Sequence, residues 1–452
     1  MTIPLLPHAI KSLTDKLLSF THQPQADPIV QVSVDISAIP LMAWLASQSI
    51  YPRLYWKGRD TEEEVAAVGC CNDFMFGEDV DDFEMSARYQ AQRNLTNNQN
   101  VRYYGGVAFD RKHESWSEFG QARFILPRVE LRRSGDVFTL LANLNFSENS
   151  VEQEIALTLK TIAQLNKAKP LSPPNKVKLM ARNDKPNRHR WTELVNKVTH
   201  SQFIQQTPKV VLSRQTQLEI NEHVDPWTLL ACWQGRNPNS FQFGFQFSPE
   251  RAFISCTPER LYRRRQRELF TEALAGTTVR GLNQEDDEAL AKALLTDIKN
   301  SHENQLVRQQ IVSVLSPLSH YVGAEELPTI FKLSHIQHLH RAIRAELKSE
   351  INDFQLIEAL HPTPAVGGLP KAAAIHFIRQ QEGYARGWYA GACGYFNKHE
   401  SEFAVAIRSA LIEPGRINLF AGAGIVAGSE PDKEWCELEN KLATVLSILT
   451  EL

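Results

Sequence analysis

The sequence lacks any long apolar run, and no stretch approaches the roughly 18 consecutive apolar residues that a membrane-spanning helix needs. Residues 1–20 also lack the basic start, apolar core and small-residue cleavage site of a signal peptide. The formal net charge of −3 provides neither the basic surface that binds nucleic acid nor a polybasic membrane anchor. We therefore expect a cytoplasmic protein with no nucleic-acid or membrane partner.

Cysteines are few and scattered, without the spacing of a metal centre or of a disulfide framework. They are expected to be reduced thiols, most of them buried. Any bound metal should be a hard ion held by oxygen, since the grouped polar residues are carboxylates. The six cysteines are Cys70, Cys71, Cys232, Cys256, Cys393 and Cys436.

The rest of the composition is that of an ordinary globular protein, with 42% hydrophobic and 22% charged residues in a chain of 452. Residues 1–167 are rich in β-branched and aromatic segments and contain no cluster of nucleophiles or ligands, which predicts a β-rich scaffold half. Residues 168–190 are polar and contain several prolines, which indicates a long surface connection. Residues 191–452 are expected to carry the functional site and to share one fold with the first half.

The hydrophobic patterns predict an α+β chain with much antiparallel sheet. Gly105 and Gly106 mark a turn or a close approach of the backbone. The expected helices span residues 8–20, 151–167, 191–205, 285–297 and 301–315. The expected strands span residues 29–36, 51–57, 103–109, 122–126, 137–144, 209–214, 241–247, 252–256, 403–407 and 419–426, with 241–247 half-buried.

A glycine-containing strand near the C-terminus is the feature around which the chain is organised. The apolar strand runs into Gly422 and Gly424, where the missing side chains let a ligand approach the backbone closely. A helix is expected to follow, because Ser429 can cap it and Pro431 is tolerated in its first turn.

That helix carries charges beside its buried face. Glu434, Glu437 and Lys441 fall within roughly 60° of one another, and the apolar stripe that begins with Leu438 and Leu442 lies only roughly 80° away. Two carboxylates and an ammonium at this edge suit the joint binding of a cation and an anion. The alternative is an exposed face of i,i+4 and i,i+7 ion pairs.

Glu303 is a second carboxylate in an apolar position. It extends the stripe of Val307, Ile311 and Val314 on helix 301–315 by one turn. A carboxylate on an apolar face is costly unless a cation or a metal pairs with it. The alternative is a first-turn glutamate that the helix dipole favours.

These segments resemble, in sequence and in order, the motifs of the chorismate-utilising enzymes, which include isochorismate, salicylate, anthranilate and aminodeoxychorismate synthases. The resemblance covers residues 190–452 and implies the α+β fold of anthranilate synthase component I, in which large antiparallel sheets pack together with helices outside them. Within the family, the chain is most similar to the isochorismate synthases of menaquinone synthesis, through KVVLSR, GWYAGACGYF and IYPRLYWK at residues 50–57. The ordered motifs are KVVLSR from Lys209, TPERL from Thr257, EALAGT from Glu272, SHEN from Ser301, HPTPAVGG from His361, GWYAGACGYF from Gly387, AIR ending at Arg408, AGAGIV from Ala421 and EWCELENK from Glu434.

The resemblance implies a Mg²⁺-dependent conversion of chorismate to isochorismate, in which water adds at C2 of the ring and the C4 hydroxyl leaves. Lys209 matches the family's general base, which must be neutral to accept a proton. Glu259 matches the acid, which needs a raised pKa to keep its proton at neutral pH. Glu303 and Glu437 match the direct Mg²⁺ ligands, and Glu434 is expected to bind the ion through water.

The resemblance also implies a binding site for the dianionic substrate. Arg408, Tyr389 and Lys441, with the backbone of Gly422 and Gly424, are expected to hold a substrate carboxylate. The ring is expected to contact Ala275, Gly276, Thr277, His338 and Thr363. For His338 and Tyr389 the alternative is a polar group satisfied within the core.

Other activities of the family leave several alternatives. Ala275 stands where aminodeoxychorismate synthases carry a lysine nucleophile, and the Leu-Leu-Glu-Ser motif of anthranilate synthases is not found, so neither amination nor an obligatory glutaminase subunit is expected. Salicylate synthase and isochorismate synthase of a siderophore pathway stay open, because they share nearly all the same site residues. A non-catalytic chorismate-binding regulatory protein is a further alternative, although the base, acid and ligand residues are present. The oligomeric state, monomer or homodimer, stays open.

Overall fold

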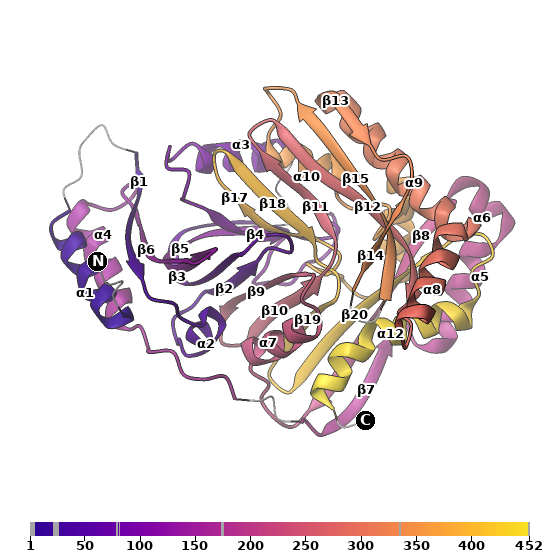
Figure 1. Ribbon diagram of the computed structural model, residues 1–452, viewed down its shortest axis with the longest axis horizontal. Helices are drawn as coiled ribbons and strands as arrows, with labels where there is room; N and C mark the ends of the chain where they lie inside the picture. The colour runs from indigo at the N-terminus through magenta and orange to yellow at the C-terminus, as the bar shows by residue number, and fades with distance from the viewer. Residues whose placement is uncertain are drawn as a thin grey trace.

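The computed structural model describes residues 5–20, 27–77, 80, 82–172, 176–333 and 336–450. Every pairing between its described strands is antiparallel, and long helices lie outside the strands (Figure 1). The predicted α+β architecture with extensive antiparallel pairing is therefore confirmed.

Strand β5 (Ala122–Ser134) is the branch point of the sheet, because it pairs with three other strands. One arm contains β1 (Ile29–Ile36), β2 (Arg53–Lys57), β3 (Glu63–Phe76), β6 (Val137–Asn145), β7 (Leu179–Lys185), β8 (Lys209–Ile220), β9 (Phe241–Ser248), β10 (Arg251–Thr257), β16 (Gly368–Leu369), β19 (Ser409–Glu413) and β20 (Arg416–Ile425). This arm extends to both sides of β5. On the first side it continues through β6 to β1. On the other side it runs through β3, β2, β9, β10, β19, β20 and β8 to β7, and β16 pairs with the start of β8.

The second arm leaves β5 through β4, and its far end forms the opposite wall of the cavity described below. It contains β4 (Tyr103–Val107), β11 (Arg260–Arg265), β12 (Glu268–Val279), β13 (Ser319–Ala324), β14 (Thr329–Lys332), β15 (Ile336–Leu347), β17 (Ala392–Phe396) and β18 (Glu400–Val405). The order is β5, β4, β17, β18, β11, β12 and β15, and β15 then pairs with both β13 and β14.

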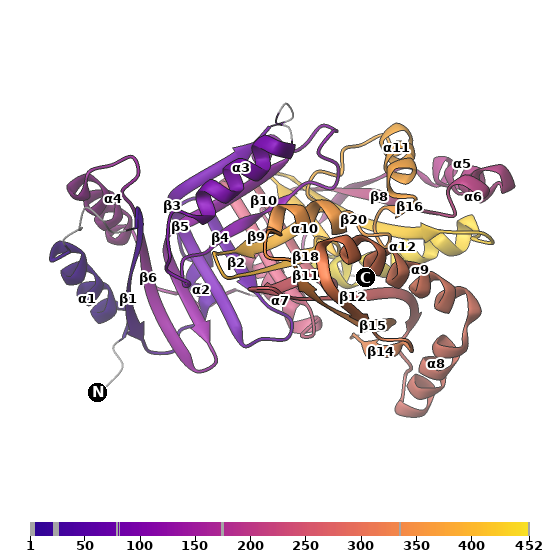
Figure 2. The ribbon, with the colours of Figure 1, turned by 90° about the horizontal axis from the view of Figure 1, so that it is seen from above.

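Helices lie at both ends of the molecule and along its sides (Figures 1 and 2). They are α1 (Leu6–Leu18), α2 (Leu41–Ala46), α3 (Asp82–Arg93), α4 (Val151–Ala163), α5 (Arg188–Thr199), α6 (Ser201–Gln206), α7 (Pro226–Arg236), α8 (Gln284–Thr296), α9 (Ile298–Leu315), α10 (Asp353–Leu360), α11 (Lys371–Gln381) and α12 (Pro431–Leu449), with a 3₁₀ turn at Ser316–Leu318. Helices α1 and α4 lie beyond β1 and β6, whereas α5, α6, α8, α9 and α12 lie at the other end. The apolar stripe predicted for α12 is buried along its length.

The two halves of the chain are joined by strand pairing in both arms. Strand β2 pairs with β9, and β4 pairs with β17. Gly106 lies in β4 at this junction, where an added Cβ would lie 2.7 Å from Cys393 Sγ and 2.8 Å from the Trp388 ring. The predicted close approach of the backbone at Gly105 and Gly106 is therefore confirmed, and it occurs within a strand rather than in a turn.

The connection predicted over residues 168–190 is more ordered than its composition indicates. It contains β7 and the first residues of α5, and β7 pairs with β8 over most of its length. Two of its prolines, Pro173 and Pro174, lie outside the described residues. The exposed side chains of β7 agree with a surface location, and the composition did not indicate the hydrogen-bonded strand at the sheet edge, because such a strand can remain exposed and polar.

Two local predictions were wrong. The strand at Phe241 is buried on both faces: α7 packs against it, with Trp227 close to Gly244, and its glutamines Gln242 and Gln246 lie inside. Ser429 does not cap α12: the residue before the helix is Glu430, and the Ser429 hydroxyl accepts a hydrogen bond from Val426 N.

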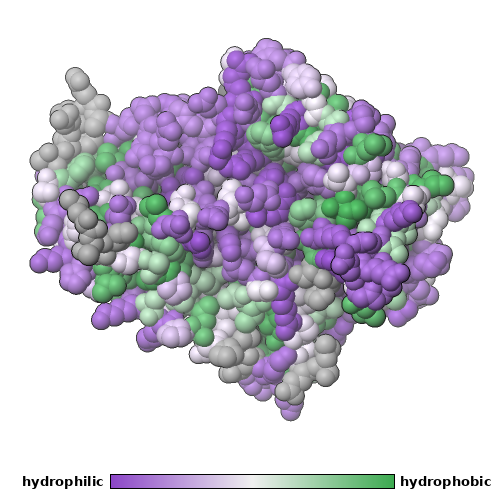
Figure 3. Space-filling view, in the orientation of Figure 1, coloured by the Kyte–Doolittle hydropathy of each residue, from purple (hydrophilic) through white to green (hydrophobic). Residues whose placement is uncertain are grey.

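The apolar side chains form one continuous buried cluster that extends from α1 to α12. Hydrophilic residues cover most of the face shown in Figure 3, and hydrophobic residues form small separate groups on it. None of the described helices is long and apolar enough to cross a bilayer.

Candidate active site

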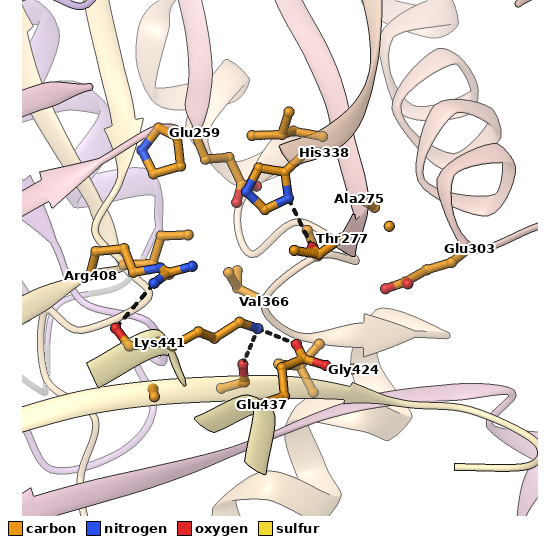
Figure 4. A pocket seen from close by; sticks show the side chains of 18 of the residues that line it. Glu259, Ala275, Thr277, Glu303, His338, Val366, Arg408, Gly424, Glu437 and Lys441 are labelled. Carbon is orange, nitrogen blue, oxygen red and sulfur yellow. Dashed lines mark hydrogen bonds and ion pairs between the residues drawn. The ribbon is translucent and has the colours of Figure 1, made fainter. Parts of the chain in front are cut away.

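A cavity lies where β8 and β20 of one arm approach β12 and β15 of the other, next to α9 and α12 (Figure 4). Its lining residues are Val211, Pro258, Glu259, Leu274, Ala275, Gly276, Thr277, Lys299, Asn300, Glu303, His338, Ala365, Val366, Tyr389, Ile407, Arg408, Phe420, Ala421, Gly422, Gly424, Glu434, Glu437 and Lys441. The cavity therefore collects segments that are far apart in the sequence but come from the ends of both sheet arms.

Glu259 lies in the short connection between β10 and β11, with its carboxyl group buried in the cavity wall. Burial raises its pKa to about 8, and the nearby carboxylate of Glu272 adds to the rise. The Thr363 hydroxyl donates a hydrogen bond to Glu259 Oε1 at 3.3 Å. The carboxyl group is therefore mainly protonated at neutral pH and can donate a proton to a ligand.

Lys209 is the first residue of β8, and its side chain is fully buried. Its Nζ donates a hydrogen bond to Glu303 Oε1 at 2.8 Å. Gly424 leaves room for this pair, because an added Cβ would lie 3.0 Å from Glu303 Oε1 and 3.2 Å from Lys209 Cε. The glycine predicted to admit a ligand therefore also lies against the Lys209–Glu303 ion pair.

Helix α9 brings Glu303 and Asn300 to the cavity, and its Asn304 packs against the sheet. Asn304 is buried and donates to backbone carbonyls of both β12 and β15, which fixes the helix against the sheet. Asn300 Oδ1 accepts a hydrogen bond from Thr277 N at 3.2 Å. Glu303 lies between these two anchors and points into the cavity (Figure 4). Its position is therefore set by amide contacts on either side of it.

Helix α12 carries the charges predicted at the edge of its buried face. Lys441 Nζ donates to Glu437 Oε1 at 2.5 Å and to Gly422 O at 2.7 Å. Although burial opposes it, the Lys441 ammonium lowers the pKa of Glu437. Burial raises the pKa of Glu434, whose carboxylate lies 3.7 Å from Lys299 Nζ. These charges line the cavity, and Lys441 with Glu437 also forms an i,i+4 ion pair in which the Glu437 side chain is 41% exposed.

Arg408 and Tyr389 supply a cation and a phenol to the same cavity. The Arg408 backbone has a φ of +49°, which non-glycine residues adopt rarely, and its Nη1 donates to Lys441 O at 3.0 Å. Burial lowers the pKa of Arg408 to about 10, so the guanidinium stays charged at neutral pH. The Tyr389 ring stacks on Phe420 with ring centroids 4.9 Å apart.

His338 faces the cavity from β15, opposite Thr277 of β12. The pairing of the two strands is irregular between Ala275 and Thr277, where Gly276 has a φ of +82°. Thr277 Oγ1 lies 2.8 Å from His338 Nδ1, whereas His338 Nε2 has no hydrogen-bond partner among the described residues (Figure 4). Burial and the charge of Arg408 lower the pKa of His338 to about 3, so the ring is neutral.

All but two of the predicted site residues line this one cavity. The exceptions lie directly behind it: Lys209 contacts Glu303, and Thr363 contacts Glu259. The structure thus brings the predicted residues together, and the roles assigned to them stay predictions.

Several lining residues were not predicted from the sequence. Lys299 and Asn300 precede Glu303 by four and three positions on α9, so helical spacing could have found them. Val366 lies within the HPTPAVGG motif and could have been taken from it. Phe420 precedes the glycines of β20, but nothing in the sequence separates it from other apolar strand residues.

The carboxylates of the cavity are paired with lysines in this structure. Glu303 is held by Lys209, and Glu437 is held by Lys441. Among the described residues, no three His, Cys, Asp or Glu side chains converge into a group that could hold a metal ion. The donor type suits a hard cation, but protein side chains alone do not complete its coordination.

The fold and the cavity are those of a chorismate-binding enzyme. The chain belongs to this family, whose model, described as chorismate binding enzyme, matches residues 13–450. It is 34% identical over 446 residues to isochorismate synthase MenF from Escherichia coli K12, covering 97% of this chain and 98% of that protein. The predicted family is therefore confirmed.

Solved structures agree with this assignment. MenF, the menaquinone-specific isochorismate synthase from Escherichia coli, superposes with a TM-score of 0.88 at 33% identity, covering 98% of this chain and 100% of that chain. Anthranilate synthase component I from Streptococcus pneumoniae superposes with a TM-score of 0.71 at 19% identity, covering 95% and 96% of the two chains. The predicted fold type is therefore confirmed.

Proposed function

We propose that this chain is an isochorismate synthase, which converts chorismate to isochorismate in menaquinone biosynthesis. Its similarity to MenF over nearly the whole of both chains supports the proposal. The structural observation that carries it is Glu259, a buried carboxyl group in the cavity wall that keeps its proton at neutral pH. Such a group can protonate a leaving hydroxyl, which mere binding of chorismate does not require.

In the proposed reaction, Lys209 takes a proton from water as the water oxygen bonds to C2 of the ring. The ring double bonds shift, and the C4 hydroxyl leaves as water with the proton of Glu259. Lys209 then holds one proton more and Glu259 one fewer, so a proton must return to Glu259 through solvent before the next turnover. Lys209 Nζ donates a hydrogen bond to Glu303 in this structure, and to act as a base the amine must be neutral, with its lone pair free to face the water.

The cavity suits a dianionic substrate. Arg408 and Lys441 provide positive charge, and Tyr389 with the backbone at Gly422 and Gly424 would complete the contacts to a substrate carboxylate. The remaining predicted residues would contact the ring: Ala275, Gly276, Thr277, His338 and Thr363.

We propose Mg²⁺ as the cofactor, because the anionic donors of the cavity are carboxylates, which this ion prefers. Glu303 and Glu437 would hold it directly, and Glu434 would hold it through water. When bound, the ion would neutralise a substrate carboxylate and orient the substrate. Since no three described side chains converge on one point, a substrate carboxylate and water would have to complete the coordination.

We propose that residues 1–167 act as a scaffold for the catalytic region at 191–452, with residues 168–190 connecting them. Strand pairing between the two regions in both sheet arms supports a scaffold role for the first region. The proposed reaction adds water rather than ammonia to the ring and releases the C4 hydroxyl as water, so it requires no glutaminase subunit. A cytoplasmic location, as predicted from the sequence, is part of the same proposal.

Incubation of the purified protein with chorismate and Mg²⁺, followed by chromatography of the products, tests the proposed activity. We expect isochorismate as the main product, and the Glu259→Gln variant is the matched control that should lose it. Dominant salicylate would favour the salicylate synthase alternative. Saturable binding of chorismate without turnover would favour the regulatory protein.

A further inference from the structure

A buried ion pair joins the N-terminal half of the chain to the strand behind Glu259. Arg59 follows β2, and its Nη1 and Nη2 atoms each lie 2.7 Å from an oxygen of Glu272 on β12. Only 4% of the Arg59 side chain and 3% of the Glu272 side chain are exposed. The Arg59 guanidinium also lies over the ring of Phe331, 4.9 Å from its centroid. The pair is therefore enclosed on several sides.

The same two side chains hold the backbone on both sides of Glu259. Arg59 Nη1 donates a hydrogen bond to the carbonyl of Pro258, the residue before Glu259. Glu272 Oε1 accepts a hydrogen bond from the amide of Arg260, the residue after it, at 3.0 Å. Both peptide units that flank Glu259 are thus tied to one ion pair, which restricts the direction of the Glu259 side chain.

The geometry depends on a planar, forked cation. One guanidinium bonds both oxygens of Glu272 and the Pro258 carbonyl at once, which a single lysine ammonium reproduces poorly. A buried ion pair adds little net stability, because desolvation of the two charges offsets their attraction. Stability alone is therefore a weak explanation for placing this pair beside a short segment of the cavity wall.

The charge of Glu272 also links this ion pair to Glu259. Although burial opposes ionisation, Arg59 and His340 keep the pKa of Glu272 well below its usual range. The resulting fixed negative charge helps Glu259 to retain its proton, while Lys209 and Lys441 act in the opposite direction.

We propose that Arg59 and Glu272 are positioning residues for the proton donor: their ion pair clamps the peptide units around Glu259, so that the N-terminal half of the chain sets the placement of the acid. The inference rests on the proposed function, in which Glu259 protonates the leaving hydroxyl. Arg59 and Glu272 are not among the residues that line the cavity, so they act through Glu259 and not on the substrate.

The kinetic test compares Arg59→Gln and Glu272→Gln with the unaltered protein. We expect kcat to fall roughly 10- to 100-fold, as for a misplaced catalytic group, while the KM for chorismate changes by less than about twofold. The kcat of Arg59→Lys should lie between that of the unaltered protein and that of Arg59→Gln. This variant serves as the test if Arg59→Gln does not fold. The matched control is Arg267→Gln, which removes an exposed ion pair with Glu346 next to the same strand and should leave kcat unchanged.

Double variants separate a positioning role from general damage. In a Glu259→Gln background, Arg59→Gln should lower the residual kcat by less than about twofold, because the group it positions is already absent. A normal kcat in Arg59→Gln would overturn the proposal. If Arg59→Gln lowered kcat in the Glu259→Gln background as much as it does in the unaltered protein, the proposal would be overturned as well.

Hydrogen exchange tests the clamp without relying on any reaction. The amides of residues 259–261 should exchange at least about tenfold faster in Arg59→Gln and Glu272→Gln than in the unaltered protein or Arg267→Gln, because the fold that protects them is loosened locally. Unchanged exchange would overturn the proposal even if chorismate is converted normally. If the unaltered protein fails to convert chorismate, the proposed function fails, and the exchange result still decides whether the clamp exists.

Discussion

At the scale of single residues, Glu259 holds its proton because its surroundings disfavour the charged form. Burial is the main cause, and the fixed charge of Glu272 is the second. The TPERL motif allowed Glu259 to be identified from the sequence, but nothing near it indicated burial, the Thr363 hydroxyl or Glu272. Thr363 lies far away along the chain, and Glu272 lies on β12, beyond the intervening strand β11. The chemistry therefore required a raised pKa, but the local sequence could not predict what would raise it.

The raised pKa predicts an alkaline limit to activity. Glu259 acts as an acid only when protonated, so its ionisation should make kcat fall about tenfold per pH unit above a pH of about 8. In Glu259→Gln, kcat should be lower by roughly 10²–10⁴-fold and this alkaline limb should vanish. A kcat profile measured from pH 6 to 10 checks both, and a limb that persists in Glu259→Gln would contradict the assignment.

Lys209 is predicted to matter for turnover but not for binding. Its side chain contacts Glu303 behind the cavity wall and is not among the lining residues. Lys209→Ala should therefore lower kcat by roughly 10²–10⁴-fold, the usual contribution of a general base, while calorimetry still detects chorismate binding. Near-normal turnover in this variant would remove Lys209 from the mechanism.

At the scale of elements, α9 and α12 carry the predicted metal ligands. The interrupted apolar stripe of α9 correctly indicated that Glu303 has a special environment, and the structure supplies Lys209 as its partner. The anchoring of α9 by Asn304 was not predictable, because the carbonyls it bonds belong to β12 and β15, and their proximity depends on the sheet. Spacing along a helix can therefore reveal a face, but not what that face meets.

A Mg²⁺ titration tests the role of α9. Glu303→Gln keeps the shape of the side chain but removes its charge, so the Mg²⁺ concentration for half-maximal activity should rise by more than about tenfold. His302→Gln alters the neighbouring exposed residue of the same helix and is the matched control, with no shift expected. An unchanged titration in Glu303→Gln would exclude this carboxylate as a ligand.

At the scale of the whole molecule, the family resemblance predicted the fold class, but the local patterns did not predict how the halves join. Strand β3 was missed, although it is the longest strand of the N-terminal half, because it begins with two glutamates and continues through small residues. Strand β7 was taken for a connection for a similar reason, since its side chains are mostly exposed. Pairings such as β4 with β17 join residues almost three hundred positions apart, which no short-range pattern records.

The junction between the halves predicts a global effect of a small substitution. Gly106→Ala would place a methyl group within 2.8 Å of Cys393 Sγ and the Trp388 ring, across the β4–β17 pairing. Crowding of this kind should lower the free energy of unfolding by about 1–3 kcal/mol. Denaturant unfolding monitored by both fluorescence and circular dichroism checks this. Gly383→Ala is a poor control because of its positive φ, whereas Gly235→Ala lies in α7, where an added Cβ meets nothing within 4 Å, and should leave stability unchanged or raise it by up to about 1 kcal/mol.

The unpartnered Nε2 atom of His338 has a consequence for inhibitor chemistry. A buried nitrogen without a hydrogen bond is costly by about 1–3 kcal/mol until a ligand supplies its partner. Because the ring is neutral, this preference is for a polar atom at one place and not for a charge. Two compounds that differ only in having a hydroxyl or a hydrogen opposite this atom should therefore bind with clearly different affinities. Compounds that mimic only the substrate carboxylates would not make use of this difference.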